Sequence, residues 1–128
     1  GAGSDNPHLP HNYPRNCVVY PGTHDNDTAV GWYESLPEEV REHFRKYTAS
    51  DGREVNWVMA RLAMASVADL AVIPFQDILG LGSEARMNYP GRPEGNWRWR
   101  SLPGALTPEM KSRLAELTYI YGRWRRGP

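Results

Sequence analysis

Two short apolar segments, separated by a long stretch of helical pattern, constrain the fold of this chain most strongly. Residues 16–20 (NCVVY) lie between turn residues, and residues 70–73 (LAVI) end at Pro74. Short apolar runs bounded by turn formers are typical of buried strands. The second run is too short for periodicity to separate strand from helix, but its β-branched pair and the following proline favour a strand.

Helical patterns fill most of the remaining chain. One helix is expected to begin at a capping box formed by Ser35 and Glu38, after a loop over residues 21–31. A second is expected over residues 53–69, where apolar residues recur at helical spacing. A last helix is expected over residues 107–122, starting with threonine and proline and ending at glycine.

The order of strand, helices, strand, long loop and helix predicts an α/β fold. Polar residues follow both predicted strands: residues 23–27 (THDND) follow the first, and Gln76 and Asp77 follow the second. In open α/β sheets and in (β/α)8 barrels this edge carries the active site. Two strands cannot form a sheet with its own core, and a barrel needs about 250 residues. The pattern is typical of the last part of such a barrel.

Composition excludes several classes of protein. With 128 residues, 40% of them hydrophobic, one globular domain is expected. The single cysteine, Cys17, rules out an internal disulfide framework. No apolar run approaches the length of a membrane span, so a reducing compartment is expected, with neither membrane nor nucleic acid as a partner. Although the last third of the chain is basic, its arginines are interleaved with Pro, Gly and Trp rather than gathered on one helix face.

The polar segment after the first strand allows several interpretations. A zinc site could be drawn from His8, His11 and His24 with Asp25 or Asp27. This is disfavoured because the first two histidines lie on a proline-rich loop, and no metal is expected. A calcium loop fails because its sixth position holds valine instead of glycine, and no serine-hydrolase motif occurs. A purely structural turn remains open, since Asp and Asn are common turn residues.

Glycosyl transfer fits this segment chemically. Its transition state places positive charge on the sugar ring, which a fixed carboxylate stabilises while imidazole and amide groups hold hydroxyls. Asp25, His24 and Asn26 offer these groups at the end of the predicted strand. Trp32 and Tyr33 follow closely and offer aromatic faces for a sugar ring.

Six segments occur together, in order, that resemble one enzyme family. They are HLPHNY, GTHDNDT, GW, PFQDILGLG, RMNYPG and NWRWR. From residue 6 to about residue 121 the chain is similar to the C-terminal part of the 4-alpha-glucanotransferases, also called amylomaltases or disproportionating enzymes. The resemblance implies an elaborated (β/α)8 barrel of the alpha-amylase group. Residues 1–128 would then form its seventh and eighth βα units, as one barrel domain incomplete at the N-terminus.

The resemblance also implies an activity and residue roles. The family cleaves an α-1,4 bond of a glucan and transfers the segment to the 4-hydroxyl of an acceptor glucose or maltooligosaccharide, with retention and without a cofactor. Asp25 matches the carboxylate that stabilises the transition state, and His24 its sugar-binding neighbour. The matching nucleophile and acid/base motifs do not occur in this sequence. The chain is therefore expected to be a fragment, inactive without the missing part of the barrel.

Further sugar contacts are expected at Asn26, Trp32, Gln76, Arg86 and Asn88. For the last three, a purely structural role remains open. Three other tryptophans, Trp57, Trp97 and Trp99, are expected to be packing residues. A non-catalytic glucan-binding or structural module derived from an amylase-type barrel is the alternative function. The expected location is the cytoplasm, or a plastid if the source is a plant or alga.

Overall fold

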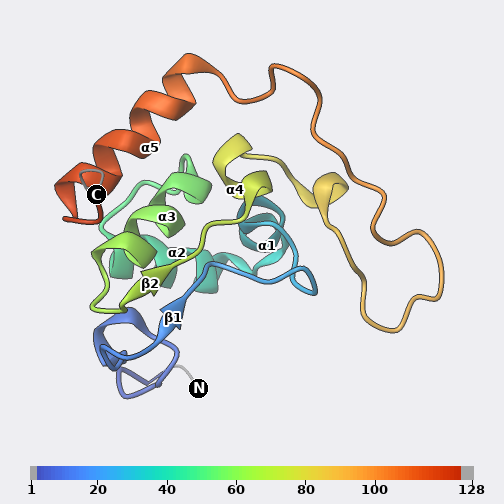
Figure 1. The fold of residues 1–128 in the computed structure, drawn as a ribbon. Coiled ribbons are helices and arrows are strands. Elements are labelled where there is room, and N and C mark those ends of the chain that lie inside the picture. Colours follow the sequence, from blue (N-terminus) through green and yellow to red (C-terminus); the bar gives the residue numbers. More distant parts are fainter. Residues whose placement is uncertain (1–2, 125–128) are drawn as a thin grey trace.

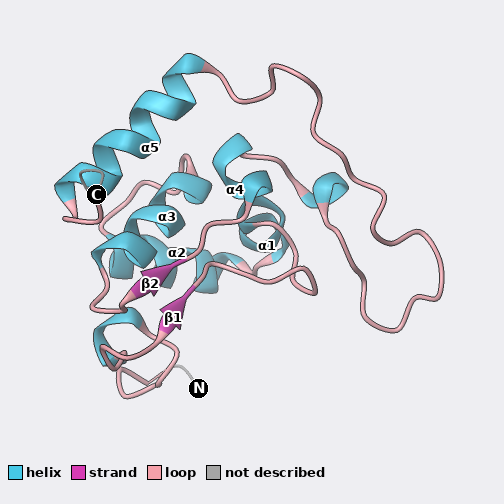
Figure 2. Ribbon diagram, in the orientation of Figure 1, coloured by secondary structure: helices cyan, strands magenta, loops and turns pink. Residues whose placement is uncertain are grey.

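The computed structural model describes residues 3–124 and places helices around a small two-stranded sheet (Figures 1 and 2). In chain order the α-helices, strands and 3-10 helices (η) are η1 (Pro10–Asn12), β1 (Val18–Val19), α1 (Ala29–Ser35), α2 (Glu38–Thr48), α3 (Val55–Ala65), β2 (Leu70–Ala71), α4 (Phe75–Leu79), η2 (Ser83–Ala85) and α5 (Pro108–Ile120). Within residues 3–124, no helix is both long and apolar enough to cross a membrane.

The two predicted strands form and pair with each other. β1 and β2 run parallel, with Val18 opposite Leu70 and Val19 opposite Ala71. Each strand is shorter than its apolar segment. A parallel pair needs a crossover connection, which α1, α2 and α3 supply (Figure 1). Val19 is only 6% exposed because it packs against Ala63 of α3. This strand–helix–strand arrangement is the α/β pattern that the sequence predicts.

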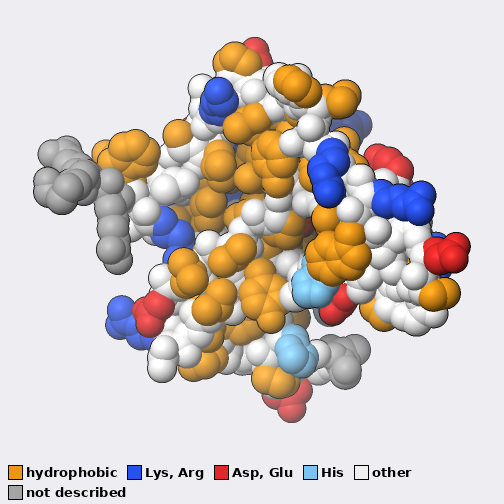
Figure 3. All heavy atoms as spheres, turned by 45° about the vertical axis from the view of Figure 1, so that its right-hand side comes forward, with side chains coloured by type: hydrophobic (Ala, Val, Ile, Leu, Met, Phe, Trp, Pro, Cys, Tyr) orange, Lys and Arg blue, Asp and Glu red, His pale blue; other side chains and the backbone are white. Residues whose placement is uncertain are grey.

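The opposite face of the strand pair is apolar and open. Side chains alternate between the faces of a strand, so residues two apart share a face. About half of each of four such side chains is exposed: Val18, Tyr20, Leu70 and Val72. Figure 3 shows hydrophobic side chains gathered across the middle of this side of the molecule. We call these four residues the open strand face.

Helix α1 begins where the sequence predicted a loop, so the boundaries expected around residues 21–31 are wrong. Thr28 caps α1, because its Oγ1 accepts a hydrogen bond of 3.1 Å from the Gly31 amide. The expected capping box is also absent: Ser35 is the last residue of α1, and its hydroxyl donates to a carbonyl one turn earlier. Helix α2 follows Pro37, which has no side-chain capping bond.

Helices α3 and α5 hold the main core. Trp57, Ala60 and Met64 of α3 pack with Leu117 of α5, all of them at most 8% exposed. The packing role expected for Trp57 is therefore confirmed. The start of α5 is also confirmed, because the Thr107 hydroxyl accepts a hydrogen bond from the amide of Met110, the third residue of the helix. Helix α3 ends earlier than predicted, at Ala65, where the chain becomes extended.

The long segment between β2 and α5 is partly helical. It contains α4 and η2, where the sequence predicts a long loop. Gly80 ends α4 in the left-handed conformation, at φ 70°, where an added Cβ would lie 3.1 Å from the Asn56 amide nitrogen. The rest of the segment, residues 86–106, runs as an extended loop around one side of the molecule to α5 (Figure 1).

Candidate active site

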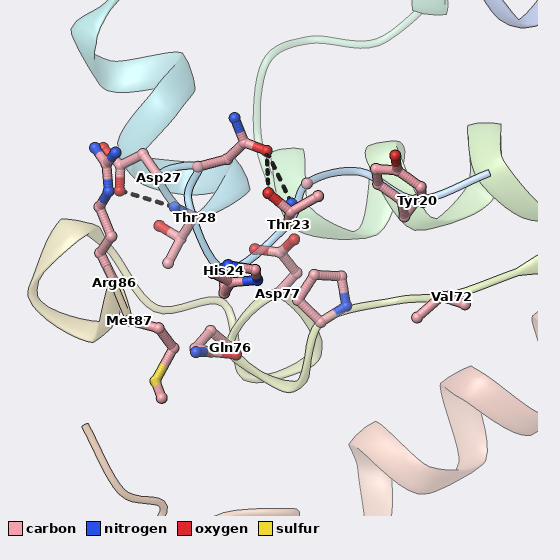
Figure 4. A pocket seen from close by; sticks show the side chains of 13 residues that line it. Tyr20, Thr23, His24, Asp27, Thr28, Val72, Gln76, Asp77, Arg86 and Met87 are labelled. Atoms are coloured by element: carbon pink, nitrogen blue, oxygen red, sulfur yellow. Dashed lines mark hydrogen bonds between the residues drawn. The ribbon is translucent and has the colours of Figure 1, made fainter. Parts of the chain in front are cut away.

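The loop that follows β1 is folded by its own side chains. The Asn26 side-chain oxygen accepts hydrogen bonds from the Thr23 amide at 2.9 Å and the Thr23 hydroxyl at 3.0 Å. Figure 4 shows both bonds across the base of the loop. Hydrogen bonds typical of a structural turn, one of the interpretations of this segment, are therefore present. They occupy the oxygen of Asn26, one of the residues expected to bind sugar.

His24 and Asp25 lie at the exposed tip of this loop. The His24 Nε2 atom is 3.3 Å from Asp25 Oδ1, and about half of each side chain is exposed. Asn88 donates from its side-chain amide to the same carboxylate oxygen at 2.6 Å. The Asn88 backbone amide also donates to the His24 carbonyl at 3.1 Å. The Asp25 carboxylate is therefore held by its neighbour His24 and by Asn88, which comes from a segment far away in the sequence.

Arg86 fixes the segment that contains Asn88 to the loop after β1. Its Nη2 donates to the Asp25 carbonyl at 2.7 Å, and its Nε donates to the Asn88 carbonyl at 2.8 Å. Its guanidinium also lies 4.4 Å from the ring centre of Tyr89, over the ring, and the Arg92 guanidinium lies 4.2 Å from the same centre. Four predicted site residues therefore form one contact network: His24, Asp25, Arg86 and Asn88. We call these four the loop cluster.

Trp97 belongs beside this cluster, although the sequence analysis assigned it to packing. Its ring centre is 5.0 Å from that of His24, and the residue is 51% exposed. Its backbone has φ 61°, which is uncommon for a bulky residue, and its amide donates to the Met87 carbonyl at 2.6 Å. Trp99 instead lies against Phe75 at 6.4 Å between ring centres. No sequence signal separated these two tryptophans.

A cleft of about 360 Å³ opens beside the loop cluster, at the ends of β1 and β2 (Figure 4). Its lining comprises Tyr20, Gly22, Thr23, His24, Asn26, Asp27, Thr28, Val72, Pro74, Gln76, Asp77, Arg86 and Met87. Gln76 is one of these residues, and its side-chain amide donates to the Ala85 carbonyl at 3.3 Å. The cleft lies at the strand edge where an α/β protein places its ligands.

Trp32 does not line this cleft. It is 38% exposed and its ring meets Phe44 edge-on, at 5.7 Å between ring centres. It borders a neighbouring hollow together with Asn26 and Met59. The structure therefore places Trp32 behind the loop rather than beside His24.

Two further carboxylates, those of Asp77 and Asp27, bind backbone amides where this loop joins α1. Asp77 is 3% exposed, and its Oδ1 accepts a hydrogen bond of 2.8 Å from the Ala29 amide. Asp27 accepts from the Thr28 amide at 2.8 Å and from the Ser83 hydroxyl at 2.7 Å. Burial raises the pKa of Asp77 and the charge of Asp27 raises it further, while the bond from Ala29 opposes both. One sequence feature points to this role, since Asp77 comes shortly after the second strand, in α4.

The zinc alternative has no support in the geometry of the described residues. The two ring nitrogens of His11 lie 2.8 Å from the Tyr47 hydroxyl and 2.7 Å from the Ser4 carbonyl. Across residues 3–124, no group of three or more His, Cys, Asp or Glu side chains is placed to hold a metal ion.

Comparisons with known proteins identify the family. A family model described as 4-alpha-glucanotransferase matches residues 1–105. The chain belongs to the 4-alpha-glucanotransferase family. It is 55% identical to the 4-alpha-glucanotransferase of Thermus thermophilus, over 88% of this chain and 24% of that protein. It is 49% identical to the chloroplastic/amyloplastic 4-alpha-glucanotransferase of Oryza sativa subsp. japonica, over 96% of this chain and 21% of that protein.

Part of one solved amylomaltase structure has the same fold as this chain. The chain superimposes on the amylomaltase from Streptococcus agalactiae in complex with acarbose with a TM-score of 0.92 and 34% identity. This match covers 97% of the chain and 25% of the amylomaltase. The chain thus spans about a quarter of the length of the relatives it matches, and the family resemblance seen in its six sequence segments is confirmed.

Proposed function

We propose that residues 1–128 form the C-terminal part of the catalytic barrel of a 4-alpha-glucanotransferase, comprising about its seventh and eighth βα units. The parallel pair of β1 and β2, with its helical crossover and a cleft at the strand ends, fits this role. The open strand face fits it as well, because the strands of a closed barrel bury their inward side chains. The remaining strands would come from the rest of the barrel.

The proposed reaction transfers a segment of an α-1,4-glucan to the 4-hydroxyl of glucose or a maltooligosaccharide. The observation that carries this proposal is the carboxylate of Asp25, held half exposed at the end of β1 by His24 and Asn88 in a chain of this family. As positive charge develops on the sugar ring, this preorganised carboxylate stabilises it. The nucleophile and the acid/base belong to the rest of the barrel, so residues 1–128 alone do not catalyse transfer.

The neighbouring residues would bind and orient the glucan. His24 has one ring nitrogen near Asp25 and one ring face against Trp97, which leaves its other edge for a sugar hydroxyl. Arg86 and Asn88 hold the backbone and side chain of Asp25, and Gln76 lines the cleft. Asn26 and Trp32 are retained as sugar contacts on the neighbouring hollow. The proposed location remains the cytoplasm or, in a plant or alga, a plastid.

Substitution of Asp25 tests the proposal. The background is a chimera in which residues 1–128 replace the matching segment of the Thermus thermophilus relative, hereafter the chimera. We expect Asp25→Asn to lower kcat for transfer from maltotriose about 10²–10³-fold, with a smaller effect on KM, because the carboxylate acts mainly in the transition state. Circular dichroism and the melting temperature serve as folding checks.

A matched control is available on the same chain. Asp51→Asn removes an exposed carboxylate that lies on a turn beside Arg53, away from the cleft, so kcat should stay within about twofold. A folded Asp25→Asn chimera with kcat within about threefold of the parent would remove Asp25 from the mechanism. A chimera that binds acarbose but transfers nothing, with an intact Asp25, would favour the non-catalytic glucan-binding module.

A further inference from the structure

The loop cluster is connected to α1 by a short stretch of chain. Asp25 is followed by Asn26 and Asp27, and Thr28 then caps α1. Any shift of the first turn of α1 therefore moves the carboxylate of Asp25. What holds that turn in place therefore helps to decide where this carboxylate lies beside the cleft.

Side chains from outside the loop hold the first turn of α1. The Asp77 carboxylate, at the start of α4, accepts from the Ala29 amide at 2.8 Å. The Ser83 hydroxyl, in η2, donates to Asp27 Oδ2 at 2.7 Å, and Asp27 Oδ1 accepts from the Thr28 amide. Carboxylates near a helix N-terminus are favourable. Residues from the segment after β2 therefore fix the loop after β1 at two points.

These contacts leave no room for a side chain at Gly31 of α1. A Cβ added at Gly31 would touch Ser83 Oγ and lie 2.6 Å and 2.7 Å from the two carboxylate oxygens of Asp27. Such distances are far below ordinary van der Waals contact. The glycine of the GW segment is thus explained by the close approach of η2 to α1, which brings the Ser83 hydroxyl onto Asp27.

Asp77 is itself held rigidly. Its backbone carbonyl accepts a hydrogen bond of 2.7 Å from the Asn56 side chain, and Asn56 is 5% exposed in α3. Its carboxylate is buried with the charge of Asp27 nearby, an arrangement that raises its pKa and costs stability when it is ionised. A group that costs stability where it lies, beside a functional loop, is typical of a site built for geometry rather than for stability.

We propose that Asp77, assisted by Ser83, is a positioning residue for glucan transfer, which holds the first turn of α1 so that Asp25 keeps its place in the loop cluster beside the cleft. The inference rests on the proposed function, because it concerns the carboxylate that the reaction uses. Asp77 does not act on the substrate in this role. Its effect passes through Ala29 to the loop.

Kinetics of the chimera test the inference. We expect Asp77→Ala to lower kcat about 10–100-fold, with KM changed less than about threefold, because small misplacements of a catalytic group cost up to about 10² in rate. Asp77→Asn keeps an oxygen acceptor for the Ala29 amide and should recover kcat to within about fivefold. Ser83→Ala should lower kcat about 3–10-fold. The double variant should lose less than the product of the two single effects, because both side chains hold one loop.

A distant control separates positioning from stability. Arg113→Ala removes the bidentate pair with Glu54, with distances of 2.8 Å and 2.7 Å, which joins α5 to the start of α3. It should lower the melting temperature and leave kcat within twofold. All rates are measured well below each variant's melting temperature, so that every variant is folded during the assay. A folded Asp77→Ala chimera with kcat within threefold of the parent overturns the inference.

Amide hydrogen exchange provides a readout that needs no turnover. We expect Ser83→Ala and Asp77→Ala to increase exchange at the amides of residues 24–31 and leave exchange in α5 unchanged. Should Asp77→Ala fail to fold, Ser83→Ala decides alone: unchanged kcat together with unchanged exchange refutes the inference. A different outcome is that Asp25→Asn retains activity while exchange at residues 24–31 rises as expected in Asp77→Ala and Ser83→Ala. In that case the proposed role of Asp25 fails, and the role of Asp77 and Ser83 in holding the loop stands.

Discussion

Replacement of Gly31 by alanine should destabilise α1, although helix propensity alone favours alanine over glycine. Alanine in a helix interior is favoured over glycine by roughly 0.5–1 kcal/mol, so propensity alone predicts a more stable α1. The structure predicts the opposite change in the stability of α1. The new methyl group would occupy the space of the hydrogen bond between Ser83 and Asp27 and would press on the bond from Thr28 to the same carboxylate.

The magnitude follows from the bonds that must break. Hydrogen bonds to charged groups are worth about 1.5–3 kcal/mol each. The short side chain of Asp27 is bonded to the Thr28 amide, and that of Ser83 is bonded to Asp27, so neither can move away without losing a bond. Loss of one such bond outweighs the propensity gain, and we expect the opening free energy of α1 to fall by about 1–2 kcal/mol.

Native-state hydrogen exchange at the α1 amides of the chimera measures this opening free energy directly. The Gly31→Ala, Ser83→Ala double variant is the informative companion. Without the Ser83 hydroxyl the tightest contact disappears, so the double variant should recover part of the loss. Slower exchange in Gly31→Ala than in the parent would mean that propensity wins, and would refute the close packing of η2 on α1.

Two further outcomes are expected. Thr107→Ala should lower the unfolding free energy by about 1 kcal/mol, measured by urea titration, because Thr107 caps α5 through the Met110 amide. The raised pKa of Asp77 predicts a pH dependence: because the folded state holds this proton more tightly than the unfolded state, unfolding free energy falls as pH rises from the usual Asp pKa of about 4 through the raised folded value. Urea midpoints across this range should show the decline in the parent and a flatter profile in Asp77→Asn, and an equal slope in both would contradict it.

The sequence predicted those parts of the fold that local chemistry decides. Both strands follow from apolar runs between turn formers, and the start of α5 follows from threonine and proline at its cap. Helix α1 has a local start signal in its cap Thr28, but the bond that fixes its first amide comes from Asp77, nearly fifty positions later in the chain. No local pattern reports such a partner.

The candidate site likewise combines residues that the sequence predicts with residues that depend on distant contacts. His24 and Asp25 could be named because polar residues at the ends of parallel strands share an edge. Resemblance supplied Arg86 and Asn88, and the structure brings both onto Asp25. Trp97 could not be assigned, since its contact with His24 depends on a positive φ in an irregular loop.

The pairing of β1 with β2 has a consequence for synthesis of the chain. β1 leaves the ribosome about fifty residues before its partner, which at roughly 5–20 residues per second takes on the order of 3–10 s. During this interval one edge of β1 lacks its partner β2, and the apolar face of α3 that later covers Val19 is not yet complete. Nascent chains stalled between residues 30 and 70 should therefore be the ones that holdase chaperones retain.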